Sequence, residues 1–233
     1  MNEQYSPTGF RVLPPVVKHL LIINVLMFLA TFTLNRFHID LAEILGLHFF
    51  KASNFRFYQL LTYMFMHANF EHLFFNMFAL WMFGNTIENI WGAKRFLVFY
   101  LVCGLGAGLC QEVVQYIQYT TTLADYASVN MGGGRVLSMD GYLNMMNTVG
   151  ASGAIYGLLL AFGMLFPNAM IYLYFLFPIK AKWFVIGYAV IEVLSGFFSN
   201  GNIAHFAHLG GMLFGLLLIL HWKKKGTLYD QPQ

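Results

Sequence analysis

Charged residues are scarce in this sequence, and their scarcity limits the kinds of protein that it can encode. Only 10% of the 233 residues are Asp, Glu, Lys or Arg. Soluble domains carry about 25%, so much of this surface must face something other than water. Hydrophobic residues make up 58% of the chain, and the mean hydropathy is +0.61. The net charge of +3 includes no basic stripe with interleaved aromatics, so nucleic acid is not an expected partner.

Side chains that would support two other kinds of chemistry are also missing from the apolar stretches. All four aspartates lie outside those stretches: Asp40, Asp125, Asp140 and Asp230. An aspartyl mechanism within a membrane is therefore not indicated. The histidine-rich segment "HANFEH" lacks the zinc-protease spacing H-E-x-x-H, so we predict neither a metal nor a cofactor. The two cysteines, Cys103 and Cys110, are about 10 Å apart along a helix, too far for a disulfide.

Apolar stretches recur along the chain, and about 20 residues of helix cross a ~30 Å hydrocarbon layer. The stretches are continuous rather than alternating, which argues against a transmembrane barrel. We predict an all-α membrane protein, a six-transmembrane-helix bundle with helices at 16–34, 72–90, 95–116, 151–166, 182–198 and 206–222. Segments 35–69 and 117–149 are predicted as long loops. The predicted organisation is an N-terminal segment (1–15), one membrane domain (16–222) and a tail (223–233).

Basic residues predict how this bundle is oriented. Nine of the 13 Lys and Arg residues precede the first helix, follow the sixth, or lie in the short connections after the second and fourth. The remaining four are spread over the two long loops. Because cytoplasmic loops carry the excess of Lys and Arg, we predict that both termini are cytoplasmic, which requires an even number of spans.

Polar side chains inside the predicted spans gather at one depth. In this orientation the second, fourth and sixth helices all begin at the outer face. His72 and Asn76 lie near the start of the second helix, Ser152 starts the fourth, and His205 and His208 open the sixth. Polar residues at membrane depth are costly and are functional candidates. Glu88 and Glu192 also lie in spans, but no run of paired charges indicates an ion path.

Glycine pairs predict that two of these helices approach closely. Gly153 and Gly157 form G-x-x-x-G in the fourth helix, and Gly211 and Gly215 repeat it in the sixth. Such small faces let helix backbones pack tightly in membranes. The crossing presents a serine and a histidine to one another. Taken alone, Ser152 is more often a packing residue and His208 more often an interhelical hydrogen-bonding residue than a catalytic one.

The pairing at that crossing is chemically specific. Ser152 and His208 have the types needed for a nucleophile and its general base. Tyr156, one turn after the serine, is placed to stack on the imidazole. His72 and Asn76 share one helix face and can donate to a developing oxyanion.

Three segments resemble the rhomboid intramembrane serine proteases: "GASGAIYG", "HANFEHLFFNMFALW" and "AHLGGMLFG". The resemblance covers about residues 60–220. It implies Ser152 as nucleophile, and it implies His208 rather than His205 as base because glycines follow three and seven residues later. It also implies an oxyanion site of His72, Asn76 and the Ser152 amide. Further supporting residues are Tyr156, Gly150, Gly153, Gly157, Gly211 and Gly215. The family acts through a dyad without an acidic third member.

The resemblance implies an intramembrane serine endopeptidase that cleaves the transmembrane helix of single-span membrane proteins through an acyl-enzyme. We expect a multi-pass protein embedded in the lipid bilayer of a bacterial inner (plasma) membrane, with the active site opening to the outer face. Two alternatives are an inactive relative that binds and escorts membrane proteins and a small-solute transporter, although no internal repeat indicates the latter. One departure is Tyr58-Gln59, where relatives often carry Trp-Arg. The oligomeric state is not defined by the sequence.

Overall fold

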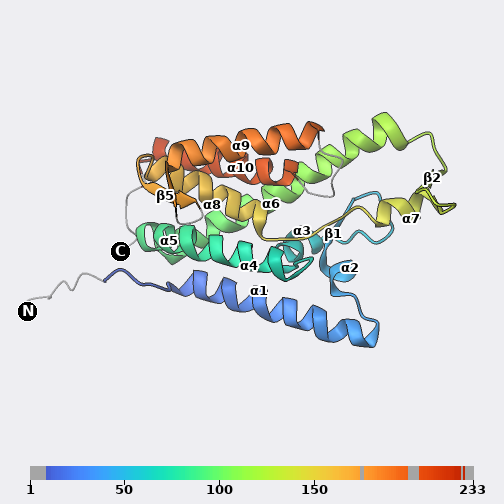
Figure 1. Cartoon of the computed structure of the whole chain (residues 1–233), viewed down its shortest axis with the longest axis horizontal. Coiled ribbons are helices and arrows are strands. Elements are labelled where there is room, and N and C mark those ends of the chain that lie inside the picture. Colours follow the sequence, from blue (N-terminus) through green and yellow to red (C-terminus); the bar gives the residue numbers. More distant parts are fainter. Residues whose placement is uncertain (1–8, 174–175, 199–204, 227, 229–233) are drawn as a thin grey trace, which may run out of the picture.

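The structure, a computed structural model, describes residues 9–173, 176–198, 205–226 and 228. It has a helix at each of the six predicted positions (Figure 1). The first begins at Pro15, where the fixed φ and missing N–H of proline suit a helix start. The bounds of these helices are α1 Pro15–Leu34, α4 Phe70–Ala79 with η3 Leu80–Gly84 and α5 Asn85–Trp91, α6 Ala93–Gln118, α8 Ser152–Leu165, α9 Ala181–Phe198 and α10 His205–Lys224.

The two predicted long loops contain short elements that the sequence analysis did not predict. The first holds η1 Asn35–Phe37, α2 Leu41–Leu45, β1 Leu47–His48, α3 Gln59–Thr62 and η2 Tyr63–Phe65. The second holds η4 Tyr119–Leu123, β2 Ser128–Asn130, β3 Val136–Ser138, α7 Met139–Asn144 and β4 Asn147–Thr148. A further hairpin, β5 Met170–Leu173 and β6 Phe177–Lys180, precedes α9.

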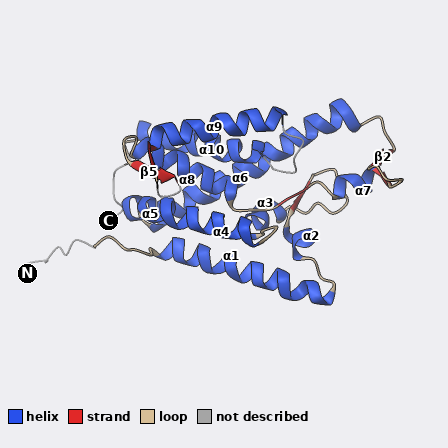
Figure 2. Ribbon diagram, in the orientation of Figure 1, coloured by secondary structure: helices blue, strands red, loops and turns tan. Residues whose placement is uncertain are grey.

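The described strands form three two-stranded antiparallel sheets, β1–β4, β2–β3 and β5–β6 (Figure 2). The β1–β4 pair joins the two long loops, with Leu47 opposite Thr148 and His48 opposite Asn147. The chain is therefore mostly helical rather than purely so. The predicted loop at 117–149 also starts too early. Helix α6 continues to Gln118, and the π-helical turn η4 extends the helical backbone to Leu123.

By length and composition, four described helices are long and apolar enough to cross a membrane: Pro15–Phe37, Ala93–Leu123, Ala181–Phe198 and His205–Lys224. Helix α8 is apolar but shorter. The α4–η3–α5 rod is interrupted by a wider helical turn at Leu80–Gly84, yet its backbone stays right-handed helical at both joins. Such π-turns insert into otherwise regular helices.

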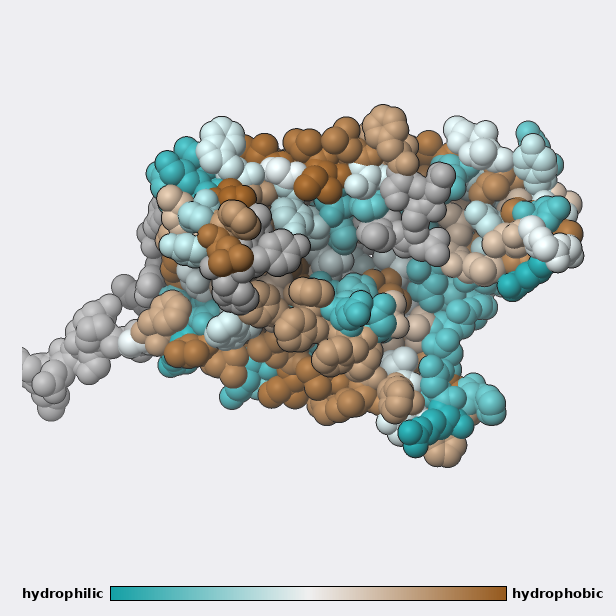
Figure 3. All heavy atoms as spheres, viewed as in Figure 1, coloured by the Kyte–Doolittle hydropathy of each residue, from teal (hydrophilic) through white to brown (hydrophobic). Residues whose placement is uncertain are grey.

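The bundle has an inner set and an outer set of helices. Helix α10 packs against α6 and α8, which also contact each other. Helices α1 and α9 lie at opposite edges in Figure 1. Both expose large apolar side chains, such as Leu26 and Phe32 on α1 and Ile191 and Phe197 on α9. Figure 3 shows these edges as brown hydrophobic surface, as expected for helices that face lipid.

Helix α1 is attached to the bundle by a buried carboxylate. Glu88 of α5 accepts the backbone N–H of Val16 at 2.9 Å and of Val17 at 2.8 Å. It thereby satisfies first-turn donors that have no partner within the helix. Nearby, Trp91 packs edge-on against Trp222 of α10 with ring centroids 5.5 Å apart. The start of α1 and the end of α10 accordingly lie at the same end of the bundle (Figure 1).

The crossing of α8 and α10 is a backbone contact. A Cβ added to Gly211 would lie 1.8 Å from the carbonyl oxygen of Gly153, and one added to Gly157 would lie 3.1 Å from that of Gly211. Gly215 continues the seam, since its Cβ would lie 3.4 Å from the Gly157 Cα. The α6 side is also filled, because the Gly157 Cβ would lie 2.4 Å from Sγ of the free thiol Cys103.

The glycine seam gives a first test. We expect Gly211→Val to lower the free energy of unfolding by at least about 1–3 kcal/mol, because a side chain there forces the two backbones apart. Gly187→Ala on α9 is the matched control, since nothing lies within 4 Å of its added Cβ. It should be neutral or stabilising by up to about 1 kcal/mol. Thermal unfolding in detergent measures the stability of both variants. Equal melting temperatures for Gly211→Val and wild type would contradict a close backbone contact at this glycine.

Candidate active site

Ser152 is presented by a turn that only glycine fits well. Gly150 has a φ of +131°, which L side chains rarely adopt. Its N–H donates to the Tyr63 carbonyl at 2.9 Å. A Cβ at this position would lie 2.8 Å from both Cε1 and Nε2 of His72. The His72 ring therefore lies against bare backbone two residues before Ser152, which is the first residue of α8.

His208 of α10 is in hydrogen-bonding contact with that serine. Its Nε2 lies 2.7 Å from Ser152 Oγ. On its flat face the imidazole stacks on the Tyr156 ring, with centroids 4.2 Å apart and planes 4° from parallel. When the hydroxyl donates to Nε2, that nitrogen is the acceptor and Nδ1 carries the ring proton. The arrangement thus has the geometry of a hydroxyl beside a general base.

Glu192 of α9 is the site residue that the sequence analysis did not assign. It is 5% exposed, and its Oε1 lies 3.0 Å from His208 Nδ1. The same oxygen accepts the Tyr156 hydroxyl, while Oε2 lies 2.6 Å from His205 Nδ1. The resemblance implied no acidic partner, but the structure places one at the histidine. The sequence did contain a signal for this contact, namely a carboxylate inside an apolar helix. A buried charge in a membrane needs a partner, so Glu192 could be expected to face polar groups.

His72 and Asn76 lie on α4 beside this cluster. The Asn69 side chain caps the helix by accepting the His72 N–H at 2.8 Å. The Ala68 N–H approaches His72 Nδ1 at 3.4 Å, which leaves Nε2 as the protonated nitrogen of a neutral ring. Asn76 is 6% exposed, and its Nδ2 donor has no hydrogen-bond partner among the described residues. His72 therefore offers one donor beside Gly150, and Asn76 offers an unpartnered donor one turn further along the same helix.

One group among the described residues has the composition of a metal site. Glu192, His205 and His208 have ligand atoms within 4.8 Å of one another, and these residue types bind zinc. The same atoms already pair directly as imidazole and carboxylate. The "HANFEH" histidines are arranged differently, with the His67 and His72 rings edge-on at 5.0 Å. Burial, helped by the nearby His72, lowers the pKa of His67 to about 3, so this ring is neutral.

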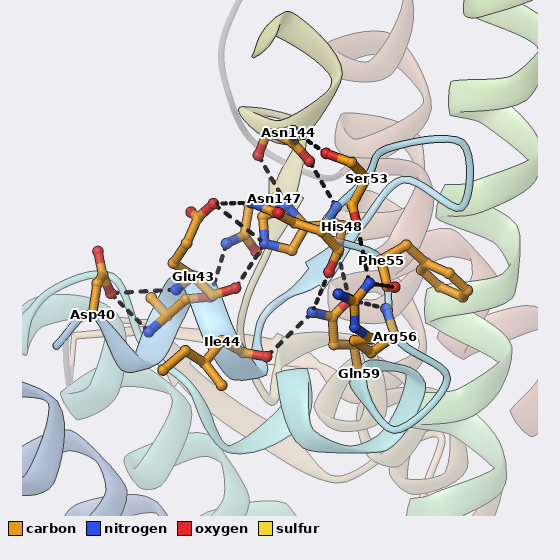
Figure 4. Close-up of polar contacts among 12 residues, drawn as sticks. Asp40, Glu43, Ile44, His48, Ser53, Phe55, Arg56, Gln59, Asn144 and Asn147 are labelled. Carbon is orange, nitrogen blue, oxygen red and sulfur yellow. Dashed lines mark hydrogen bonds and ion pairs between the residues drawn. The ribbon is translucent and has the colours of Figure 1, made fainter. Parts of the chain in front are cut away.

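A polar clip holds the segment that leads into Gly150 (Figure 4). The fully buried His48 ring contacts the Asn144 carbonyl through Nδ1 at 2.9 Å and the Glu43 carbonyl through Nε2 at 2.8 Å. Asn147 Nδ2 donates to the Ala42 carbonyl at 2.8 Å. These bonds reinforce the β1–β4 pairing. The turn before Ser152 is thereby fastened to a segment about 100 residues earlier.

Gln59, at the position where relatives often carry arginine, takes part in the same clip. Its Nε2 donates to the Ile44 carbonyl at 3.2 Å and to the Asn54 carbonyl at 3.1 Å. Its Oε1 accepts the Arg56 N–H at 3.0 Å. The side chain is 1% exposed, so Gln59 serves the structure of this loop, whereas the neighbouring Tyr58 is exposed.

The comparisons with known proteins agree with this architecture. A family model, the rhomboid domain, matches residues 54–224. The chain is a multi-pass integral membrane protein, and it belongs to the rhomboid family. The match begins after α1, so it covers the site and the five predicted helices that follow.

Three relatives illustrate the similarity. The chain is 32% identical over 155 residues to Rhomboid protein 1, mitochondrial, of Saccharomyces cerevisiae, covering 66% of this chain and 38% of that protein. It is 31% identical over 183 residues to RHOMBOID-like protein 12, mitochondrial, of Arabidopsis thaliana, covering 77% and 48%. It is 30% identical over 169 residues to the Putative rhomboid protease YdcA of Bacillus subtilis, covering 72% and 68%.

These relatives bear on the predicted location. The matched region is less than half of the yeast and Arabidopsis proteins, both of which carry mitochondrial names. The third relative is bacterial. These relatives therefore do not support the predicted bacterial inner membrane in preference to an organelle membrane.

The clip gives a second test. We expect His48→Ala to leave the Asn144 and Glu43 carbonyls unpaired and to lower the free energy of unfolding by about 1–3 kcal/mol. Amide hydrogen exchange should rise over residues 144–151. His221→Ala, on the exposed last turn of α10, is the control and should change stability by less than about 0.5 kcal/mol. Unchanged exchange in His48→Ala would show that the clip does not hold this segment.

Proposed function

We propose that this protein is an intramembrane serine endopeptidase in which Ser152 is the nucleophile and His208 the general base. The observation that carries the proposal is the 2.7 Å contact between Ser152 Oγ and His208 Nε2, made between two helices at their glycine seam. A relative whose name includes "putative rhomboid protease" supports it.

The geometry suits acyl transfer. His208 Nε2 takes the hydroxyl proton as Ser152 Oγ attacks a peptide carbonyl, and the stacked Tyr156 ring keeps the imidazole in plane. The oxyanion that forms is stabilised by His72 Nε2–H, Asn76 Nδ2 and the Ser152 N–H at the start of α8. His208 then protonates the leaving amine. Water, activated by the same imidazole, hydrolyses the acyl-enzyme and regenerates the serine. The residues supply every proton transfer without a cofactor.

The proposed topology has six crossings: α1, the α4–η3–α5 rod, α6, α8, α9 and α10. Both ends lie in the cytoplasm or its equivalent, as segments 1–15 and 223–233 flanking a membrane domain at 16–222. Nine of 13 basic residues on that side support this orientation. Helix α8 has 14 residues, about 21 Å of rise, and is shorter than a ~30 Å hydrocarbon core. Ser152 therefore sits below the opposite, outer face, where its site opens.

The substrates we propose are single-span membrane proteins that approach through the bilayer. A transmembrane helix must unwind locally before a serine reaches its carbonyl, so small or helix-breaking residues near the outer end of the span are favoured. An inactive binding or escort protein would not require the serine and histidine contact, and the experiment below distinguishes the two.

The decisive test is cleavage of a generic single-span substrate by purified protein in detergent. We expect wild type to cleave it, and we expect Ser152→Ala and His208→Ala to lose at least about 10³-fold in rate, as removal of a nucleophile or its base does in serine proteases.

A fluorophosphonate probe serves as the companion measurement. Labelling of wild type at Ser152, absent in Ser152→Ala, identifies an activated serine even if the chosen substrate is unsuitable. Full activity in His208→Ala would make the assigned base wrong. If wild type neither cleaves nor labels, the binding or escort function replaces the protease.

Topology has its own measurement. With Cys103 and Cys110 replaced by alanine, a membrane-impermeant maleimide should label Gly133→Cys in intact cells or right-side-out vesicles. It should label Lys94→Cys only after permeabilisation. The reverse pattern would invert the proposed orientation, and labelling of both without permeabilisation would exclude the six-crossing arrangement.

A further inference from the structure

We propose that Glu192 is a positioning residue for His208, so that this protein works with an acid–histidine–serine chain rather than with two residues alone. The proposal rests on the function proposed above. Its negative charge lies at ion-pair distance from His208 Nδ1 and favours a proton on that nitrogen, which leaves Nε2 free to accept from Ser152. The carboxylate then stabilises the imidazolium that forms when the serine is deprotonated.

The contacts of Glu192 are consistent with an anion held in one orientation. Three groups from two other helices face its two oxygens: His208 Nδ1 at 3.0 Å, His205 Nδ1 at 2.6 Å and the Tyr156 hydroxyl. The Tyr156 hydroxyl donates to the carboxylate, and His205 Nδ1 is in hydrogen-bonding contact with it. His208 Nδ1 lies at ion-pair distance from it and has no hydrogen-bond partner among the described residues. Tyr156 is thus engaged twice, by its ring with the imidazole and by its hydroxyl with the acid. Glu192 itself is 5% exposed.

The energetic reason lies in the charge that catalysis creates. Taking the serine proton makes His208 a cation at membrane depth, where an unpaired charge is costly. The other titratable groups that face it are Tyr156 on α8, His72 on α4 and His205 on α10. None of these is an anion at neutral pH. Glu192 supplies the opposite charge, 3.0 Å from Nδ1, the side of the imidazole on which the acid of a Ser-His-Asp triad lies.

His205 has a distinct place in this chain. It does not replace His208 as the base, because Ser152 Oγ contacts His208 Nε2, while His205 Nε2 has no hydrogen-bond partner among the described residues. Its contact prevents Glu192 from rotating away from His208. The two histidines of α10 therefore hold one acid from α9 between them, three residues apart along their helix.

The test is Glu192→Gln, which keeps the shape but removes the charge and one acceptor. We expect kcat to fall at least about 10²-fold with KM changed less than about threefold, because an amide turned toward Nδ1 favours the wrong tautomer. The midpoint of the acidic limb of kcat/KM should move to lower pH by about one unit, because the imidazolium loses its counter-charge. A merely structural role would not shift this profile.

Controls distinguish the acid at the site from buried acids in general. Glu112→Gln removes another buried carboxylate, on α6, where Oε2 accepts the Phe50 N–H at 2.8 Å and an amide oxygen can replace it. This variant should keep wild-type kcat and pH profile. Glu192→Asp keeps the charge but withdraws it by one methylene, so we expect a loss of about tenfold and an unshifted profile. If Glu192→Gln does not fold, a wild-type rate of fluorophosphonate labelling in Glu192→Asp overturns the proposal.

The outcomes separate this proposal from the function on which it rests. If wild type neither cleaves nor labels, the protease function fails. If wild type is active and Glu192→Gln matches it within twofold with the same pH profile, the function stands and the role of Glu192 is overturned. Loss of wild-type activity on chelation, restored by Zn²⁺, would also overturn it, because the cluster would then be a metal site.

Discussion

The crossing of α8 and α10 determines most of this structure. At that point the backbone of one helix lies against the backbone of the other, because Gly211 has no side chain to separate it from the Gly153 carbonyl. Ser152 directly precedes Gly153, and His208 lies three residues, less than one helical turn, before Gly211. Their separation is therefore set by main-chain contact. If long, flexible side chains separated the two helices, they would hold these two groups at 2.7 Å less rigidly.

The membrane imposes the second constraint. Polar groups at this depth lack bulk water, so they must satisfy one another. Around the site Glu192 accepts the Tyr156 hydroxyl, is in hydrogen-bonding contact with His205 Nδ1, and lies at ion-pair distance from His208 Nδ1. Among the described residues, Asn76 Nδ2, His205 Nε2 and His208 Nδ1 have no hydrogen-bond partner. A buried donor without a partner costs free energy, so the Asn76 donor has hydrogen-bonding capacity that the described residues do not use.

The sequence predicted the positions of the six helices well because continuous apolar runs and glycine spacing are local signals. It also predicted the association of Ser152, His208 and Tyr156, because those residues occur at helix starts with matching glycine offsets. It did not predict the contact of Glu192, since nothing in the α9 sequence indicates which neighbour its carboxylate faces. The β1–β4 pairing was missed for a similar reason: two-residue strands carry no periodicity, and only tertiary contact aligns them.

The separation of these contacts along the chain has a consequence for synthesis. His48 contacts Asn144, 96 residues later in the chain, and Ser152 contacts His208, 56 residues later. Contacts of such long range form late, because the loops between them must close first. A ribosome-bound chain that has not yet released α10 therefore lacks the contact between Ser152 and His208. The site becomes complete only when the last helix joins a bundle whose other helices have already been made.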